Sequence, residues 1–202
     1  MIDLALGVGA IAAVQVAGEL AVRHLRLSGE VARKLVHAGS GIAAAALPLL
    51  LSFEQIVALA LASAAVMMLV HRFRLLAALN SVDRVSYGEV WFPLGIAGLA
   101  AFFPQAYVYG ALVLGLADAL AAVVGVRFGG PRLPVVPRKT VSGSAAFVAS
   151  AILVGVAVTG SLSFVVIAAA LALTVAEAVT SRGADNVVVP VLAGLLATQW
   201  WA

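Results

Sequence analysis

The chain has no cysteine and few charged residues, which make up 10% of its 202 positions. Without cysteine, disulfide bonds and thiolate metal sites are excluded. Hydrophobic residues make up 64% of the chain and the mean hydropathy is +1.15, values that soluble domains of this size do not reach. The sequence therefore predicts an all-α integral membrane protein.

Basic residues are also missing before the first apolar stretch, which is long enough to span a membrane. We therefore expect no cleavable signal peptide. No internal repeat is evident, and the length suits one domain. We expect residues 1–202 to form a single transmembrane domain, whose many alanines and glycines allow helices to pack closely.

A spanning helix needs roughly 20 apolar residues. Eight segments qualify, although the fourth is short and the eighth is marginal, so seven spans is the alternative. The predicted polytopic helical bundle has spans at 2–22, 35–51, 54–71, 90–103, 107–126, 142–159, 162–180 and 187–201.

The twelve Lys and Arg residues all fall in alternate loops between these spans. They are Arg23, Arg26, Arg33, Lys34, Arg72, Arg74, Arg84, Arg127, Arg132, Arg138, Lys139 and Arg182. The positive-inside rule makes those loops cytoplasmic and places both termini outside. Since the outer loops are short and almost uncharged, we expect the active site at the cytoplasmic face.

Ionisable groups in membrane helices are costly and are functional candidates by default. Here they are Glu19, His37, Glu89, Asp118 and Glu177, all predicted in or just beyond the cytoplasmic third of their helices. Asp83, Asp185 and Asn186 lie in the cytoplasmic loops, whereas His24 and His71 are interpreted as interfacial loop residues.

Asp118 lies on a stripe of small residues. Gly115, Ala122, Gly125 and Gly129 recur at spacings of three and four, so they share one helix face with it. One interpretation is a packing groove whose carboxylate pairs with a loop arginine. The other is a metal ligand or general base that faces an internal site.

Loop 127–140 contains four cations, three prolines and two glycines. The next predicted helix opens on Thr140, Ser142, Gly143 and Ser144. Free backbone N–H groups, hydroxyls and Lys139 together suit a phosphate, although the Walker A motif is absent. The alternative is an ordinary cytoplasmic loop before a capped helix.

Three other stretches combine polar groups. RKLVHAGSG at 33–41 places two cations one turn before His37, which indicates either an anion site or a structural histidine. YGEVWFPLG at 87–95 places Glu89 at a membrane entry, where an acid also complements a helix dipole.

The third stretch, AEAVTSRGADNVVVP at 176–190, contains Glu177 and the pair Asp185-Asn186. Acid and amide oxygens suit a hard cation such as Mg²⁺. The alternative is a turn, which Gly, Asp and Asn favour.

These four stretches, in this order, resemble the phytol kinase and dolichol kinase family of CTP-dependent lipid-alcohol kinases. The wider group contains CTP-dependent diacylglycerol kinase and is related to the phosphatidate cytidylyltransferases. The strongest match lies in the stretch that begins at Asp118-Ala-Leu-Ala. It continues through Gly125 and Gly129 to Lys139-Thr140 and Gly143-Ser144, and it resembles the family's CTP-binding signature.

The resemblance implies transfer of the γ-phosphate of CTP, with Mg²⁺, to a membrane lipid alcohol of the phytol, polyprenol or dolichol type. We expect Asp118, Glu89 and His37 to be catalytic. The expected nucleotide-binding residues are Arg33, Lys34, Gly125, Gly129, Arg138, Lys139, Thr140, Gly143 and Ser144. The expected Mg²⁺ ligands are Asp118, Glu89, Glu177, Asp185 and Asn186.

Three alternatives stay open. A phosphatidate cytidylyltransferase would release pyrophosphate, and a CTP-dependent diacylglycerol kinase would use the same chemistry on another acceptor. A small transporter would place polar residues near mid-membrane, which the one-sided clustering argues against. We expect a prokaryotic cytoplasmic membrane protein that binds no nucleic acid and forms a homodimer.

Overall fold

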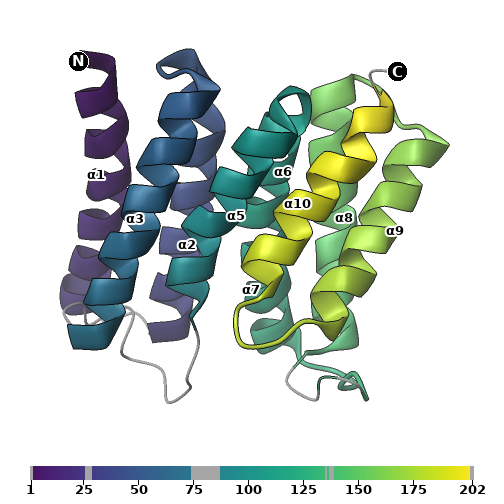
Figure 1. Ribbon diagram of the computed structural model, residues 1–202. Helices are drawn as coiled ribbons and strands as arrows, with labels where there is room; N and C mark the ends of the chain where they lie inside the picture. The colour runs from purple at the N-terminus through teal and green to yellow at the C-terminus, as the bar shows by residue number, and fades with distance from the viewer. Residues whose placement is uncertain (1, 26–28, 74–86, 135, 137–138, 201–202) are drawn as a thin grey trace.

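The computed structural model describes the chain apart from residues 1, 26–28, 74–86, 135, 137–138 and 201–202. It describes no side chains for residues 2–4, 19, 21–23, 25 and 29–32. Every named element in the described part is a helix, and β structure is limited to one isolated bridge between Arg132 and Thr140 (Figure 1). The predicted all-α class is therefore confirmed for this part of the chain.

The α-helices are α1 (Ile2–Leu25), α2 (Gly29–Ala46), α3 (Phe53–Phe73), α5 (Gly88–Phe102), α6 (Tyr107–Leu112), α7 (Asp118–Phe128), α8 (Val141–Thr159), α9 (Phe164–Val179) and α10 (Asp185–Ala197). Short 3₁₀ turns are η1 (Leu47–Leu49), η2 (Pro104–Ala106) and η4 (Thr198–Trp200). A π-helical segment, η3 (Val113–Ala117), joins α6 to α7 and makes them one continuous rod.

In the described residues the resulting rods fall at the positions of the eight predicted spans. Helices Phe53–Phe73, Pro104–Phe128 and Val141–Thr159 are long and apolar enough to cross a membrane, whereas Ala5–Gly18, Gly88–Phe102 and Phe164–Val179 are apolar but shorter. The protein is a membrane protein, and eight crossings, with seven as the alternative, stay a prediction.

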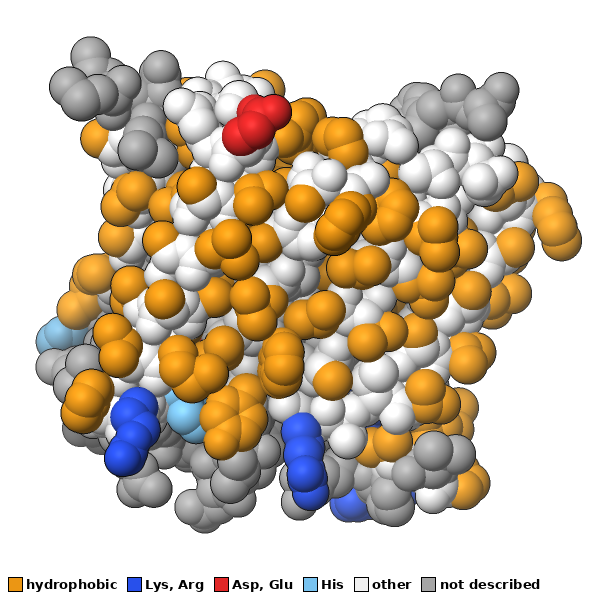
Figure 2. Space-filling view, in the orientation of Figure 1, with side chains coloured by type: hydrophobic (Ala, Val, Ile, Leu, Met, Phe, Trp, Pro, Cys, Tyr) orange, Lys and Arg blue, Asp and Glu red, His pale blue; other side chains and the backbone are white. Residues whose placement is uncertain are grey.

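The face of the bundle that Figure 2 shows is largely apolar between its two ends. Large hydrophobic side chains such as Leu61, Leu69, Leu153, Leu171 and Val175 are about half exposed or more. Apolar surface of this extent is expected against lipid rather than water.

Lys and Arg side chains gather at one end of the rods, here called the basic end (Figure 2). The two termini lie at the opposite end (Figure 1). This arrangement agrees with the alternation of basic loops in the sequence.

The rod formed by α6, η3 and α7 lies at the centre of the packing. Tyr109 belongs to a hydrophobic cluster with Phe147 of α8, and Tyr107 belongs to a second cluster with Ile56 of α3. The Tyr107 hydroxyl also donates a hydrogen bond to the Ala44 carbonyl at 3.0 Å. The rod therefore joins the two halves of the bundle.

Helix α2 crosses this rod at a pair of glycines. A Cβ atom on Gly41 would lie 2.3 Å from the Cα of Gly115, so only glycine permits the approach. Small residues let helix backbones come this close in membranes. The crossing brings Lys34 and His37, earlier on α2, against Asp118 at the start of α7.

Candidate active site

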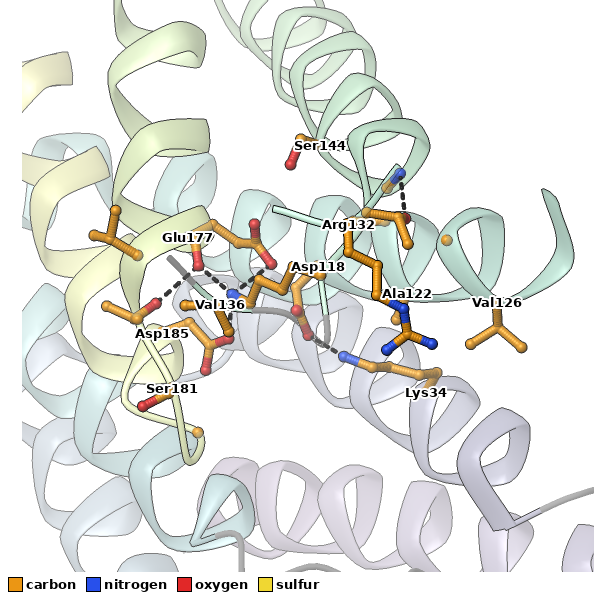
Figure 3. Close-up of a pocket in the computed structure, with 18 of the residues that line it drawn as sticks. Lys34, Asp118, Ala122, Val126, Arg132, Val136, Ser144, Glu177, Ser181 and Asp185 are labelled. Atoms are coloured by element: carbon orange, nitrogen blue, oxygen red, sulfur yellow. Dashed lines mark hydrogen bonds and ion pairs between the residues drawn. The ribbon is translucent and has the colours of Figure 1, made fainter. Parts of the chain in front are cut away.

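A polar cavity of about 850 Å³ lies at the basic end of the bundle (Figure 3). Helices α2, α7 and α9 and the starts of α8 and α10 contribute to its wall. Its charged lining residues in the described part of the chain are Arg33, Lys34, Arg132, Lys139, Arg182, Asp118, Glu177 and Asp185. The cavity therefore combines a cationic environment with a group of carboxylates.

Asp118 is held on one side by α2. The Lys34 Nζ donates to Asp118 Oδ2 at 2.6 Å, and the side chains are only 8% and 10% exposed. The Nε2 atom of His37 lies 3.1 Å from the same carboxylate oxygen and 2.9 Å from the Leu114 carbonyl. That carbonyl belongs to η3, and π-helical turns of this kind are frequent at functional sites.

Lys139 makes the second set of ion pairs in the cavity. Its Nζ lies 2.7 Å from Glu177 Oε1 and 3.3 Å from Asp185 Oδ2, and it also donates to the Glu177 backbone carbonyl (Figure 3). The loop before α8 is thereby tied to the end of α9 and the start of α10.

Three carboxylates meet between these two lysines. Asp118, Glu177 and Asp185 each offer one oxygen, and these atoms all lie within 4.8 Å of one another. Negative charges this close repel unless cations compensate them. A set of hard oxygen ligands suits Mg²⁺, which proteins commonly hold through a few carboxylates together with substrate phosphates. The residues present therefore fit a Mg²⁺ site.

The start of α8 forms the wall beside this group. Thr140 caps the helix, because its Oγ1 accepts a hydrogen bond from the Gly143 amide at 3.2 Å. A Cβ atom on Gly125 would lie 2.9 Å from Thr140 Oγ1, and one on Gly143 would lie 2.9 Å from the Ala121 carbonyl. These two glycines let α7 and the α8 N-terminus pack directly on each other.

The same wall offers hydrogen-bond donors to a ligand. The Ser144 Oγ is buried without a hydrogen-bond partner among the described residues. Buried hydroxyls are usually paired, so an orphan in a cavity wall is a candidate ligand contact. The preceding loop folds back on itself, since the Leu133 amide donates to the Lys139 carbonyl at 2.9 Å.

A second cavity, of about 540 Å³, lies beside the polar one and is called here the apolar cavity. Helices α1, α2, α3 and α5 form its walls. Arg33 and Asn186 line both cavities, whereas His37 and Glu89 line the apolar one. The two cavities are therefore neighbours with a shared wall.

The start of α5 is fixed at this boundary. The Asn186 side-chain amide donates to the Gly88 carbonyl at 2.9 Å. Glu89 pairs with His71, whose Nδ1 lies 2.5 Å from Glu89 Oε1 and whose ring packs on Tyr87. The interpretation of His71 as an interfacial loop residue is wrong, because it belongs to the last turn of α3 and pairs with an acid.

The polar cavity brings together most of the residues that the sequence singled out. These are Arg33, Lys34, Asp118, Gly125, Gly129, Lys139, Thr140, Gly143, Ser144, Glu177, Asp185 and Asn186. His37 and Glu89 line the apolar cavity instead. Arg138 and Asp83 lie outside the described residues, as does the side chain of Glu19.

Two lining cations, Arg132 and Arg182, were not among the predicted binding residues. Their location in basic loops is the only signal in the sequence, and every loop cation shares it. Gly115, expected on the same stripe as Asp118, packs against Gly41 of α2, the helix whose Lys34 pairs with Asp118, and it is absent from the described lining of the polar cavity.

Comparison with known proteins finds a similar phytol kinase from Synechocystis sp. The two sequences are 34% identical over 215 residues, which cover 98% of this chain and 91% of the relative. No family model matches the chain, and no solved structure matches it.

Proposed function

The chain belongs to the phytol kinase family of lipid-alcohol kinases, and on that premise we propose that it transfers the γ-phosphate of CTP to an isoprenoid alcohol. As a lipid-alcohol kinase it is a transferase that acts on a lipid of the membrane. The phytol, polyprenol or dolichol type of acceptor and the use of CTP are our proposals.

One observation carries the proposal. The polar cavity, whose described lining includes three carboxylates and five cations, adjoins a largely apolar cavity, and Arg33 and Asn186 line both. A kinase for lipid alcohols needs a charged site for a nucleotide and an apolar site for a chain, with the reacting atoms at their boundary. These neighbouring cavities supply that arrangement.

A Mg²⁺ ion held by Asp118, Glu177 and Asp185 would neutralise charge on the phosphate oxygens. Two other expected ligands are not assigned to the metal. Glu89 lines the apolar cavity, and the side-chain amide of Asn186 donates to the Gly88 carbonyl. We therefore assign the metal to the three carboxylates. In the structure Lys34 and Lys139 contact these acids, and both lysines are placed to contact phosphate oxygens instead when the nucleotide is present.

The start of α8 receives the triphosphate in this proposal. Helix N-termini favour phosphates because their backbone N–H groups point outward and carry partial positive charge. Gly143 lets this helix start pack directly on α7, Ser144 offers its unpartnered hydroxyl, and Arg132 adds positive charge in the cavity wall.

Phosphoryl transfer requires in-line positioning and charge neutralisation more than covalent help. The hydroxyl oxygen of the acceptor bonds to the γ-phosphorus, the bond from that phosphorus to the bridging β–γ oxygen breaks, and CDP leaves. Glu89, in the wall of the apolar cavity, takes the hydroxyl proton, because Asp118 is assigned to the Mg²⁺ site. His37 orients the hydroxyl from the wall of the apolar cavity.

We place the polar cavity at the cytoplasmic face of a prokaryotic membrane. The basic end carries the cavity, and the positive-inside rule assigns that end to the cytoplasm. Both termini, at the other end of the bundle (Figure 1), then lie outside. A tag at either terminus should be accessible only from outside intact cells, and a homodimer stays a prediction that native mass spectrometry checks.

Product analysis tests the proposal against its neighbours. Purified protein with Mg²⁺ and γ-labelled CTP should label phytol and release CDP. Labelled pyrophosphate with phosphatidate as acceptor would instead identify a cytidylyltransferase. Preference for diacylglycerol over every isoprenoid alcohol would identify a diacylglycerol kinase.

A further inference from the structure

The loop between α9 and α10 contains a turn with an unusual backbone. The Ala184 amide donates a hydrogen bond to the Ser181 carbonyl at 3.1 Å, so Arg182 and Gly183 are the two central residues of the turn. Their φ angles are 57° and 89°, and Arg182 is the one residue other than glycine with a positive φ in the described part of the chain. Positive φ at both central positions is the pattern of a type I′ turn, in which Gly, Asn and Asp predominate. The turn therefore holds an arginine in a conformation that its backbone disfavours.

The strain at Arg182 indicates that its side chain is needed in this place. Glycine adopts positive φ without the Cβ clash that other residues meet, so it would form the same turn more readily. Strained residues persist where the surrounding structure holds them, and they cluster at ligand sites. What arginine adds to the turn is a guanidinium group, and Arg182 lines the polar cavity.

The guanidinium group of Arg182 is available to a ligand. It makes no ion pair or hydrogen bond with any residue that the structure describes, and the side chain is exposed. Lys34 and Lys139, in the same cavity, are instead paired with carboxylates. A planar guanidinium group can donate to two phosphate oxygens at once, which a lysine cannot do with the same geometry. The side chain therefore suits a phosphate group of the nucleotide.

The backbone of Arg182 lies near the boundary between the two cavities. Its carbonyl accepts a long hydrogen bond, of 3.4 Å, from the amide of Tyr87, which precedes Glu89 by two residues. Asn186, four residues after Arg182, lines both cavities. The loop thus borders the place where the acceptor hydroxyl meets the nucleotide in the proposed function.

This loop and the start of α8 form different walls of the polar cavity. In the view of Figure 3, Glu177 and Asp185 lie between Ser144 of α8 and Ser181 of the loop. The start of α8 receives the triphosphate in the proposed function, and the carboxylates hold the metal. The phosphate that reaches the loop is therefore the terminal one, next to the acceptor.

We propose that Arg182 contacts the γ-phosphate of the bound nucleotide and neutralises the charge that develops on its oxygens during transfer. The turn aims the guanidinium group at this phosphate, which is why an arginine occupies a glycine-like conformation. Arginine side chains in this role accelerate phosphoryl transfer because they bind the transition state more tightly than the ground state. The inference rests on the proposed kinase function, since it assigns a side chain to the phosphate that the enzyme transfers.

Arg182→Gly tests the inference, because it removes the guanidinium group and relaxes the backbone at the same time. The melting temperature of the purified protein should rise by about 1–3 °C. Nevertheless, kcat/KM for CTP should fall about a hundredfold or more. Arg182→Lys keeps the charge but loses the planar fork, so its kcat/KM should fall about tenfold. Arg182→Asn, which also tolerates positive φ, should repeat the loss of Arg182→Gly.

Nucleotide binding shows which phosphate Arg182 contacts. In equilibrium dialysis with Mg²⁺ and no acceptor, Arg182→Gly should weaken the binding of CTP about tenfold or more. The binding of CDP should change less than about twofold, because CDP lacks the phosphate in question. The matched control is Arg127→Ala, at an exposed cation in the last turn of α7 that is absent from the described lining of the polar cavity. It should leave both affinities unchanged.

The failure of this inference is distinguishable from the failure of the proposed function. If the wild-type enzyme phosphorylates phytol but Arg182→Gly binds CTP normally, or loses CTP and CDP equally with a lower melting temperature, the role of Arg182 is overturned and the kinase is retained. If Arg182→Gly selectively loses CTP but the wild-type protein phosphorylates no alcohol, the contact to the terminal phosphate is retained and the kinase proposal is contradicted.

Discussion

Lys34 Nζ and Asp118 Oδ2 lie 2.6 Å apart, 84 residues distant in sequence and almost wholly buried. Burying one member of such a pair without the other is costly, because it leaves an uncompensated charge. The pair therefore fixes α2 against α7 while it neutralises one acid of the carboxylate group.

Removing the lysine should destabilise the fold. Lys34→Met removes the lysine charge beside the buried Asp118 carboxylate and leaves only the His37 ring against it, so we expect the free energy of unfolding to fall by about 3–5 kcal/mol. Unfolding in mixed micelles measures it. The double variant Lys34→Met/Asp118→Asn should recover much of that stability but no activity, and strictly additive losses would show that the two residues do not interact.

The glycine crossing of α2 and η3 should tolerate no side chain. In Gly115→Ala, the new Cβ would lie 2.6 Å from the Gly41 Cα, so the helices must separate. We expect a loss of about 1–3 kcal/mol in unfolding free energy, together with lower activity. Gly9→Ala is the control, because a Cβ there meets nothing within 4 Å. Equal effects of the two substitutions would contradict this role of the crossing.

Two acids of the carboxylate group should set the requirement for Mg²⁺. Glu177→Gln and Asp185→Asn each remove one charged oxygen ligand, so the Mg²⁺ concentration for half-maximal activity should rise about ten- to a hundredfold. A titration of activity with Mg²⁺ measures the change. Glu54→Gln, at an exposed acid in the first turn of α3, should leave the titration unchanged. A normal titration in both site variants would contradict the metal assignment.

The proposed base should affect turnover rather than nucleotide binding. Glu89→Gln keeps the shape of the side chain but accepts no proton, so kcat should fall about 10²- to 10⁴-fold while the KM for CTP stays unchanged. Steady-state kinetics with phytol separates the two constants. His24→Ala, at an exposed position of α1, is the control. Wild-type kcat in Glu89→Gln would exclude it as the base.

The sequence predicts the helices well because apolar length and basic loops are local properties. The segments that contain Asp118, Lys139 and Glu177 are also predicted to converge, since each places its polar group near the cytoplasmic end of a helix. Because successive helices cross the membrane in opposite directions, polar groups beside alternate loops all lie at the same face of the membrane.

Partners across helices could not be predicted in the same way. The pair of Lys34 with Asp118 and that of His71 with Glu89 depend on which rods are neighbours, and no spacing in the sequence encodes this. The packing-groove interpretation of the stripe holds for Gly115, which lies against Gly41 of α2. Asp118, on the same stripe, pairs with Lys34 of the same helix, but the sequence does not show that α2 is the neighbour.

Activity of Asp118→Asn with γ-labelled CTP, Mg²⁺ and phytol tests the central claim most directly. The account predicts that the wild-type enzyme forms labelled phytyl phosphate and that the variant, folded by the same unfolding assay, is reduced about a hundredfold or more. A folded Asp118→Asn enzyme that phosphorylates phytol at the wild-type rate would contradict it.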